Sequence, residues 1–318
     1  KEIKYPDIKL VYWAGGNPFH HQMNLKKLSK AFKQPDTIIV NEIWWNSLAR
    51  HSDIILPATT SLERNDISIK HWDQTISPMH KVIEPIGESK SDYEIFSEIA
   101  SKLNFKDKFT EGKDEDKWLR HIWDEARSKA KDEGFSLPEF DKFWKNGFQE
   151  VLSPKKQTIL LEDFRKDPQK NPISTPSGKI EIFSETVDSF NYQDCPGHPT
   201  WLEQKEWLGS NLTKQYPLQL ISGQPHNRLH SQLDNGSESQ NYKILGREPI
   251  KIHLQDAQSR GLINGDIVEV FNKRGKCLAG VIISNEVMKG VVFLPVGAWY
   301  DPINDGDFCI HGNPNVLT

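Results

Sequence analysis

The segment IKLVYWAGGNP, residues 8–18, joins a short apolar, β-branched run to a Gly-Gly-Asn-Pro turn. An apolar run that ends in turn residues predicts a buried strand. Apolar side chains then recur at helical spacing over 24–32, and residues 37–40 (TIIV) and 53–57 (DIILP) predict two more strands around a short helix at 44–50. This β-α-β-α-β order predicts a parallel sheet with helices on its faces, a Rossmann-like α/β domain over residues 1–105.

Polar residues follow each predicted strand, at the carboxyl edge of the sheet, where ligands bind in such folds. They are Asn17, His20 and His21 after the first strand, Asn41 and Glu42 after the second, and Thr59, Thr60, Glu63, Arg64, Asn65 and Asp66 after the third. Amides, carboxylates and a guanidinium could bind a nucleotide, but the same residue types also serve as turns and helix caps. The GGNP loop is not a GxGxxG fingerprint, so NAD is not specifically indicated.

The middle of the chain differs in composition. Charges are dense over 102–134, and apolar residues around Trp118 and Trp123 recur at helical spacing. We therefore expect a charged helical insertion over 106–150, and its mixed charges favour a solvated face over a membrane or calmodulin-like surface. Residues 151–214 are rich in Pro, aromatic and polar residues and predict a connecting segment, in which 175–183 has the pattern of a turn followed by a strand.

Short strands separated by turns dominate residues 215–318. The predicted strands are 218–222, 250–254, 266–271, 276–284 and 290–295, with a hairpin turn at 272–275 and a helix near 255–260. This spacing predicts a compact, mostly β domain of barrel type.

The densest polar motif is SGQPHNRLHSQLD, residues 222–234. Gly and Pro fix a turn, and the amides, imidazoles, hydroxyl and guanidinium suit a flat, heteroatom-rich ligand such as a pterin, with Arg228 open to phosphate. His226 and His230 raise the alternative of a metal ion, but Pro225 and the lack of helical periodicity disfavour it. His20 and His21 are adjacent and so would point in different directions, which makes them a poor chelate. We predict no metal ligand.

Composition excludes several classes of protein. The 318 residues carry a net charge of −4 and a mean hydropathy of −0.63, which indicates a water-exposed chain long enough for two domains. No run approaches the roughly 18–20 apolar residues of a membrane span, and no basic excess marks a nucleic-acid surface. Three separated cysteines give neither a disulfide framework nor a zinc knuckle. A GxSxG elbow and a P-loop are both missing, so we predict binding residues and no catalytic residue.

Several separated motifs together resemble one family. They are VYWAGGNPFHHQMNLKKL (11–28), TIIVNEIWWNSLARHSDIILPATTSLERNDI (37–67), SDYEIF (91–96), TPSGKIEIFSET (175–186), QPHNRLHSQLD (224–234), GVVFLPVGAWYDP (290–302) and HGNPNVLT (311–318). The chain resembles the C-terminal half of the molybdopterin-dependent S-oxide and N-oxide reductases, which include dimethyl sulfoxide, trimethylamine N-oxide and biotin sulfoxide reductases. The resemblance covers nearly the whole chain and is weakest in the charged insertion.

The resemblance implies a bis(molybdopterin guanine dinucleotide) cofactor with molybdenum and an α/β plus β fold. The Rossmann-like domain would be followed by a six-stranded, double-psi-like β-barrel, here truncated at its C-terminus. The positions that match cofactor-binding residues are Asn17, His21, Asn41, Glu42, Arg64, Asp92, Ser222, Gly223, Gln224, Pro225, Arg228, His230, Ser231, Gln232 and Asn315, with Asn313 as a near alternative to the last.

The family's reaction is oxygen-atom transfer at molybdenum from an S-oxide or N-oxide, with electrons from a c-type cytochrome or a reductase. The serine that ligates molybdenum lies upstream of the matched segment, so we expect a C-terminal fragment that is inactive alone. Relatives with a twin-arginine signal favour the periplasm over the cytoplasm. The alternative from a different class is a stand-alone nucleotide- or carbohydrate-binding module without redox activity.

Overall fold

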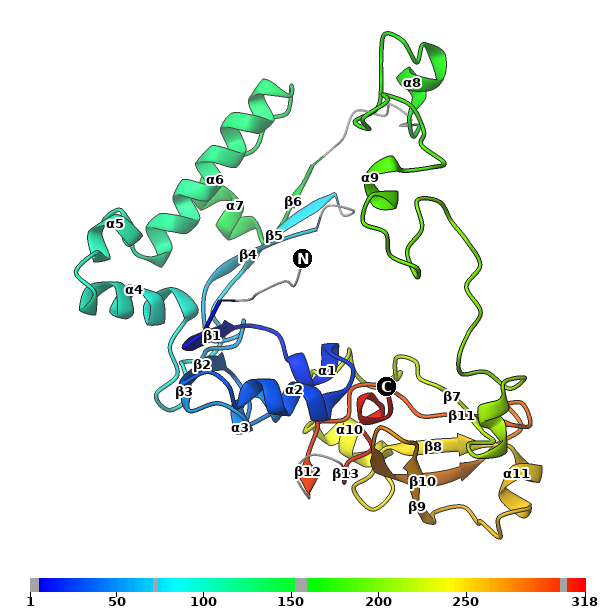
Figure 1. The fold of residues 1–318 in the computed structure, drawn as a ribbon. Coiled ribbons are helices and arrows are strands. Elements are labelled where there is room, and N and C mark those ends of the chain that lie inside the picture. Colours follow the sequence, from blue (N-terminus) through cyan, green and yellow to red (C-terminus); the bar gives the residue numbers. More distant parts are fainter. Residues whose placement is uncertain (1–5, 71–73, 152–158, 304–307) are drawn as a thin grey trace.

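The computed structural model describes residues 6–70, 74–151, 159–303 and 308–318 (Figure 1). Its first sheet holds β1 (Leu10–Ala14), β2 (Thr37–Glu42) and β3 (Ile54–Pro57), which are parallel and lie in that order. Helices α1 (Pro18–His21), α2 (Leu25–Phe32) and α3 (Ser47–Arg50) connect them. The predicted parallel α/β arrangement is therefore confirmed.

Polar residues at the strand ends begin these helices. Asn17 accepts a hydrogen bond from the Phe19 amide, and Pro18 occupies the first helical position, where its fixed φ is favourable. Asn24 and Asn46 cap the next two helices in the same way. Ser91 and Glu94 form a capping box at the start of α4 (Asp92–Lys102). These capping side chains thus set the residue at which each helix begins.

The charged insertion is helical, as predicted. It contains α5 (Lys106–Thr110), α6 (Glu115–Asp132) and α7 (Phe140–Asn146). A small core holds it together, in which the indole of Trp123 stacks on Phe143 with ring centroids 3.7 Å apart. The insertion returns to an antiparallel sheet of β4 (Asp66–Ile69), β5 (Thr75–Met79) and β6 (Gln149–Glu150), which the sequence did not predict.

The connecting segment is mostly irregular and leads from the insertion to the C-terminal sheet (Figure 1). It holds the short helices α8 (Glu162–Lys166) and α9 (Glu185–Asp188) and the 3₁₀ turn η1 (Asn211–Lys214). The predicted turn is present, since the Ile173 amide bonds to the Gly178 carbonyl. The strand expected after it is wrong: Ile180 and Ile182 are 66% and 80% exposed, so no neighbouring strand or core covers this run.

The C-terminal sheet is mixed and curls into a half-barrel (Figure 1). All five predicted strands are present, as β7 (Gln219–Ile221), β8 (Pro249–Ile252), β9 (Ile267–Phe271), β10 (Lys276–Ile283) and β11 (Val291–Phe293). The predicted hairpin joins β9 to β10. Helices α10 (Ser237–Tyr242) and α11 (Leu254–Gln258) and the 3₁₀ turn η3 (Pro314–Leu317) surround the sheet.

Two short strands were missed, β12 (Pro302–Ile303) and β13 (Phe308–Cys309). Within the described residues the sheet therefore has seven strands instead of six, in the order β12-β13-β10-β8-β11-β7 with β9 on β10. The described pairings do not join β12 to β7.

One core joins the two sheets. Phe19 and Leu25, which follow β1, are fully buried in one core with residues of the C-terminal region that include Ile252, Leu294 and Tyr300. The rings of Phe19 and Tyr300 stack at 5.5 Å, and the Ser47 hydroxyl donates to the Tyr300 carbonyl at 3.0 Å. This packing holds α1 beside the polar turn that follows β7. In the described ranges, no helix is long and apolar enough to cross a membrane.

Candidate functional site

The polar turn over residues 222–234 is fastened to the segment that follows β11. The Ser222 hydroxyl donates to the Leu294 carbonyl at 2.8 Å, and the Val296 amide donates to the Gly223 carbonyl at 3.0 Å. Within the turn, the Gln224 amide donates to the Arg228 carbonyl at 2.7 Å. Hydrogen bonds within the chain thus hold this turn in place.

Gly297 and Trp299 fix the backbone at His230 and Ser231. Gly297 has φ +100°, and a Cβ at this position would lie 1.9 Å from the His230 carbonyl oxygen. His230 itself has φ +52°. The Trp299 indole donates to the Ser231 carbonyl at 2.8 Å. The two segments approach so closely that glycine is required at position 297.

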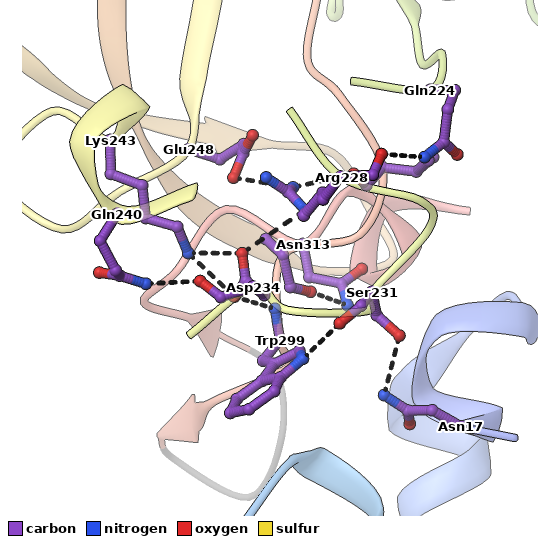
Figure 2. Close-up of polar contacts among 12 residues, drawn as sticks. Asn17, Gln224, Arg228, Ser231, Asp234, Gln240, Lys243, Glu248, Trp299 and Asn313 are labelled. Atoms are coloured by element: carbon purple, nitrogen blue, oxygen red, sulfur yellow. Dashed lines mark hydrogen bonds and ion pairs between the residues drawn. The ribbon is translucent and has the colours of Figure 1, made fainter. Parts of the chain in front are cut away.

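Four charged side chains lie behind this turn, and we call them the buried charge cluster: Arg228, Asp234, Lys243 and Glu248 (Figure 2). Their side chains are 1–3% exposed. The Lys243 ammonium lies 2.8 Å from Asp234 Oδ1, and the Arg228 guanidinium lies 3.1 Å from the Glu248 carboxylate. Burial raises the pKa of Glu248, and the charges of Arg228 and Lys243 oppose that rise. The prediction that Arg228 is open to phosphate is therefore wrong, because its guanidinium points inward to Glu248.

On the other side of the turn lies α1. The Asn17 amide is 3.4 Å from the Ser231 hydroxyl (Figure 2). The His230 ring lies 5.0 Å from the His20 ring and 5.9 Å from the His21 ring, measured between centroids. Residues from distant parts of the sequence thus meet at one place.

Asn315 completes this group through its amide, which donates to the His20 carbonyl at 2.6 Å. Asn313, the alternative position, is buried and bonds to the Phe19 and Ala298 carbonyls at 3.1 and 2.9 Å. Asn313 thus holds α1 against the C-terminal region. Asn315 is only partly buried and is therefore nearer to solvent.

His20 has distinctive electrostatics. Its side chain is 8% exposed, and burial, followed by the neighbouring His21 and His230 rings, lowers its pKa to about 4. The imidazole is therefore neutral at neutral pH, and its Nδ1 is buried without a hydrogen-bond partner. Such an atom costs about 1–3 kcal/mol unless a partner is supplied. The sequence indicated His20 only as a polar residue at the end of a strand.

A second group of predicted residues lies at the carboxyl end of β2. The Tyr12 hydroxyl donates to Asn41 Oδ1 at 2.7 Å, and the Asn41 amide donates to the Asp92 carboxylate at 2.7 Å. The Glu42 carboxylate instead accepts from the Asn46 amide at 2.7 Å. Asn41 and Asp92 are thus brought together, while Glu42 orders the following loop.

Arg64 pairs with Asp66 at the start of β4. The neighbouring Glu63 carboxylate accepts from the amide and hydroxyl of Thr60, both at 2.7 Å, and from the Ile86 amide at 2.8 Å. These hydrogen bonds lower the pKa of Glu63. The described contacts do not join Arg64 to the other predicted residues.

The remaining predicted residues are accessible. Gln232 is exposed, and Gln224 and Pro225 line a surface cavity of about 400 Å³ together with Asn227, Glu248 and Phe293. The buried Asn227 Nδ2 has no hydrogen-bond partner. The part of the chain that the structure describes contains no group of three His, Cys, Asp or Glu side chains that could hold a metal ion.

Comparison with known families gives two matches. Residues 1–102 match the family described as "Molybdopterin oxidoreductase". Residues 218–318 match the family described as "Molydopterin dinucleotide binding domain". The two matched regions contain the two groups of polar residues described above.

Curated relatives match over the length of the chain. It is 47% identical to a trimethylamine-N-oxide reductase from Haemophilus influenzae over 100% of this chain and 39% of that protein. It is 43% identical to a dimethyl sulfoxide/trimethylamine N-oxide reductase from Rhodobacter capsulatus, over 99% of this chain and 39% of that protein. A biotin sulfoxide reductase from Cereibacter sphaeroides is 42% identical, over 100% of this chain and 42% of that protein. The chain thus spans about two fifths of the length of these relatives.

Among solved structures, acetylene hydratase from Pelobacter acetylenicus has a similar fold, with a TM-score of 0.72 and 20% identity over 97% of this chain and 40% of that chain. This likeness concerns the fold alone. The matches in sequence lead to one conclusion: the chain belongs to the molybdopterin oxidoreductase family, in the group with the trimethylamine N-oxide, dimethyl sulfoxide and biotin sulfoxide reductases.

Proposed function

We propose that this chain is the cofactor-binding C-terminal portion of a molybdenum S-oxide or N-oxide reductase and helps to hold bis(molybdopterin guanine dinucleotide). One observation carries the proposal: Asn17 and the His20–His21 pair meet His230, Ser231 and Asn315 at the junction of the two sheets. These residues lie in the two regions that match the molybdopterin families. The alternative of a stand-alone binding module has no such support.

The residues present fit the cofactor. A pterin is flat and carries donors and acceptors along its edge, which amides, hydroxyls and neutral imidazoles can match. His20 Nδ1 and Asn227 Nδ2 are buried without partners, so each is a hydrogen-bonding atom that a ligand could satisfy. The pKa of His20, lowered to about 4, keeps its ring uncharged.

This chain would bind and orient the cofactor. The molybdenum of the bound cofactor would supply the oxygen-atom transfer. Asn17, His21, His230, Ser231 and Asn315 would hold the pterin. Asn41, Asp92, Glu42 and Arg64 would lie at the nucleotide end, where carboxylates suit the ribose or guanine edge. Arg228 would act indirectly, because its side chain is buried.

The finer architecture is also a proposal. We infer a Rossmann-like domain over 1–105, the insertion over 106–150, the connecting segment over 151–214 and a double-psi-like barrel over 215–318. The parallel order of β1, β2 and β3 and the curled C-terminal sheet support this division.

For the whole protein, we propose an S-oxide or N-oxide substrate, an electron donor that is a c-type cytochrome or a reductase, and a periplasmic location. The names of the relatives support the substrate class.

The test uses the full-length protein that contains this chain. After purification, molybdenum is measured by mass spectrometry and guanine nucleotide after acid release, and reduction of trimethylamine N-oxide, dimethyl sulfoxide and biotin sulfoxide is followed with reduced viologen. We expect both components and activity on at least one substrate. Active full-length protein that contains neither molybdenum nor guanine nucleotide would refute the proposal.

A further inference from the structure

The buried charge cluster is closed to solvent and balanced in charge. It contains two cations, Arg228 and Lys243, and two anions, Asp234 and Glu248, with side chains 1–3% exposed. Buried ions persist only when they are paired, because each has lost its hydration. With so little exposure, Arg228, Asp234 and Lys243 lie behind the surface that a ligand would touch, and Glu248 borders the cavity beside Gln224 and Pro225.

Two members of the cluster bond directly to the segment that supports the polar turn. The Arg228 guanidinium donates to the Val296 carbonyl at 3.0 Å. Asp234 Oδ2 accepts from the Trp299 amide at 3.0 Å and from the Lys243 ammonium at 2.9 Å. Trp299 in turn holds the Ser231 carbonyl through its indole, at 2.8 Å (Figure 2). Lys243 therefore orients Asp234, Asp234 orients Trp299, and Trp299 orients Ser231.

The other end of this chain of contacts is the candidate site. The Ser231 hydroxyl faces the Asn17 amide, and the His230 ring faces His20. Lys243 follows α10 and Glu248 precedes β8, and no contact described above joins either residue to α1. The charged side chains of these two residues reach the site through Asp234 and Arg228, while the Glu248 backbone amide also donates to the His311 carbonyl at 3.2 Å.

We propose that Lys243 and Glu248 are positioning residues that set the geometry of His230 and Ser231, and thereby the rate at which the pterin is released. This inference rests on the proposed function, since it concerns the same site. Neither residue is assigned a contact with the cofactor. Both act by pairing with Asp234 and Arg228 and holding these side chains in place inside the domain.

The test compares Lys243→Met with the double variant Asp234→Asn/Lys243→Met in the full-length protein. The single change leaves the Asp234 carboxylate buried without its nearest cation. The double change removes one charge of each sign, leaves Arg228 paired with Glu248, and keeps an oxygen at position 234 for the Trp299 amide. Release of pterin during dialysis is followed by the fluorescence of the oxidised pterin. We expect Lys243→Met to release it at least ten times faster and the double variant to restore most of the retention.

A spectroscopic signal reports on the turn itself. In protein labelled with 5-fluorotryptophan, the ¹⁹F resonance of Trp299, assigned with Trp299→Phe, should shift in Lys243→Met and return toward its original position in the double variant. Glu248→Gln keeps the shape of the side chain and removes one charge, so it should also accelerate release. It serves as the second variant if Lys243→Met does not fold.

Two controls separate positioning from general stability. Lys276→Met removes an exposed lysine of the same sheet that pairs with Glu269 and should behave as wild type. Leu119→Ala opens the distant core of the insertion and should lower thermal stability without faster release. Release from Leu119→Ala as fast as from Lys243→Met would overturn the inference, as would wild-type retention in both Lys243→Met and Glu248→Gln. Wild-type protein without any pterin would refute the proposed function instead.

Discussion

Replacement of Gly297 by alanine tests the close approach of the two segments at the candidate site. The φ of +100° costs an L-residue about 1–2 kcal/mol. The new Cβ would lie 1.9 Å from the His230 oxygen, whereas unstrained carbon contacts lie near 3.5 Å. The segments must therefore separate by more than about 1 Å, and such overpacking adds about 1–3 kcal/mol. We expect a total loss of about 2–5 kcal/mol and displacement of the turn that carries His230 and Ser231.

Gly265 provides a matched control. It has φ +90°, but nothing lies within 4 Å of the position where a Cβ would be. Gly265→Ala therefore carries only the backbone cost of about 1–2 kcal/mol. In the full-length protein, thermal unfolding and pterin content should both fall in Gly297→Ala, while Gly265→Ala should keep its pterin. Equal stability and equal pterin content in the two variants would refute the reasoning.

Three further predictions concern other parts of the molecule. The pKa of His20, about 4 in the fold against about 6.5 in an unfolded chain, means that the unfolded state gains the proton first as pH falls. The contribution of this residue to the free energy of unfolding is therefore complete above about pH 6.5 and falls by about 3 kcal/mol toward pH 4. Urea unfolding at pH 7 and 4.5 should show a smaller fall in stability for His20→Asn than for the wild type. An equal fall in the two proteins would contradict the lowered pKa of His20. Trp123→Ala should destabilise the insertion by about 3–5 kcal/mol, so hydrogen exchange in α6 should accelerate while pterin content stays unchanged; preserved protection of α6 would count against the role of the Trp123–Phe143 stack. Burial raises the pKa of the Cys277 and Cys309 thiols, while Cys195 is exposed, so a thiol reagent analysed by mass spectrometry should label Cys195 in the native protein and the other two only after unfolding. Labelling of native Cys277 would show that the sheet opens.

Local patterns made the parallel sheet and five strands of the C-terminal sheet, each of three residues or more, predictable. Contiguous β-branched runs between Gly, Pro and Asn turns are sufficient to indicate them. The strands β12 and β13 have two residues each and exist through their pairing with each other and with β10. β6 likewise pairs with β5 across the whole insertion. Such strands have no local pattern of their own.

The candidate site was predictable where turn chemistry concentrates polar residues, as in residues 222–234. The direction of the Arg228 side chain was not, because it depends on Glu248 and Asp234, which only the fold brings to it. Lys243 and Glu248 resemble ordinary surface charges in the sequence. Their burial is a property of the tertiary structure, and so is their proposed role.

The core shared by the two sheets has a consequence for synthesis of the protein. Asn313 bonds to the Phe19 carbonyl across 294 residues of sequence, and Phe19 and Leu25 share a core with residues such as Ile252 and Tyr300 that are translated much later. At about 5–20 residues per second, the ribosome needs roughly 15–60 s to supply them. During that interval the apolar faces of α1 and α2 lack their cover from the C-terminal residues on the nascent chain, and a chaperone could bind them there.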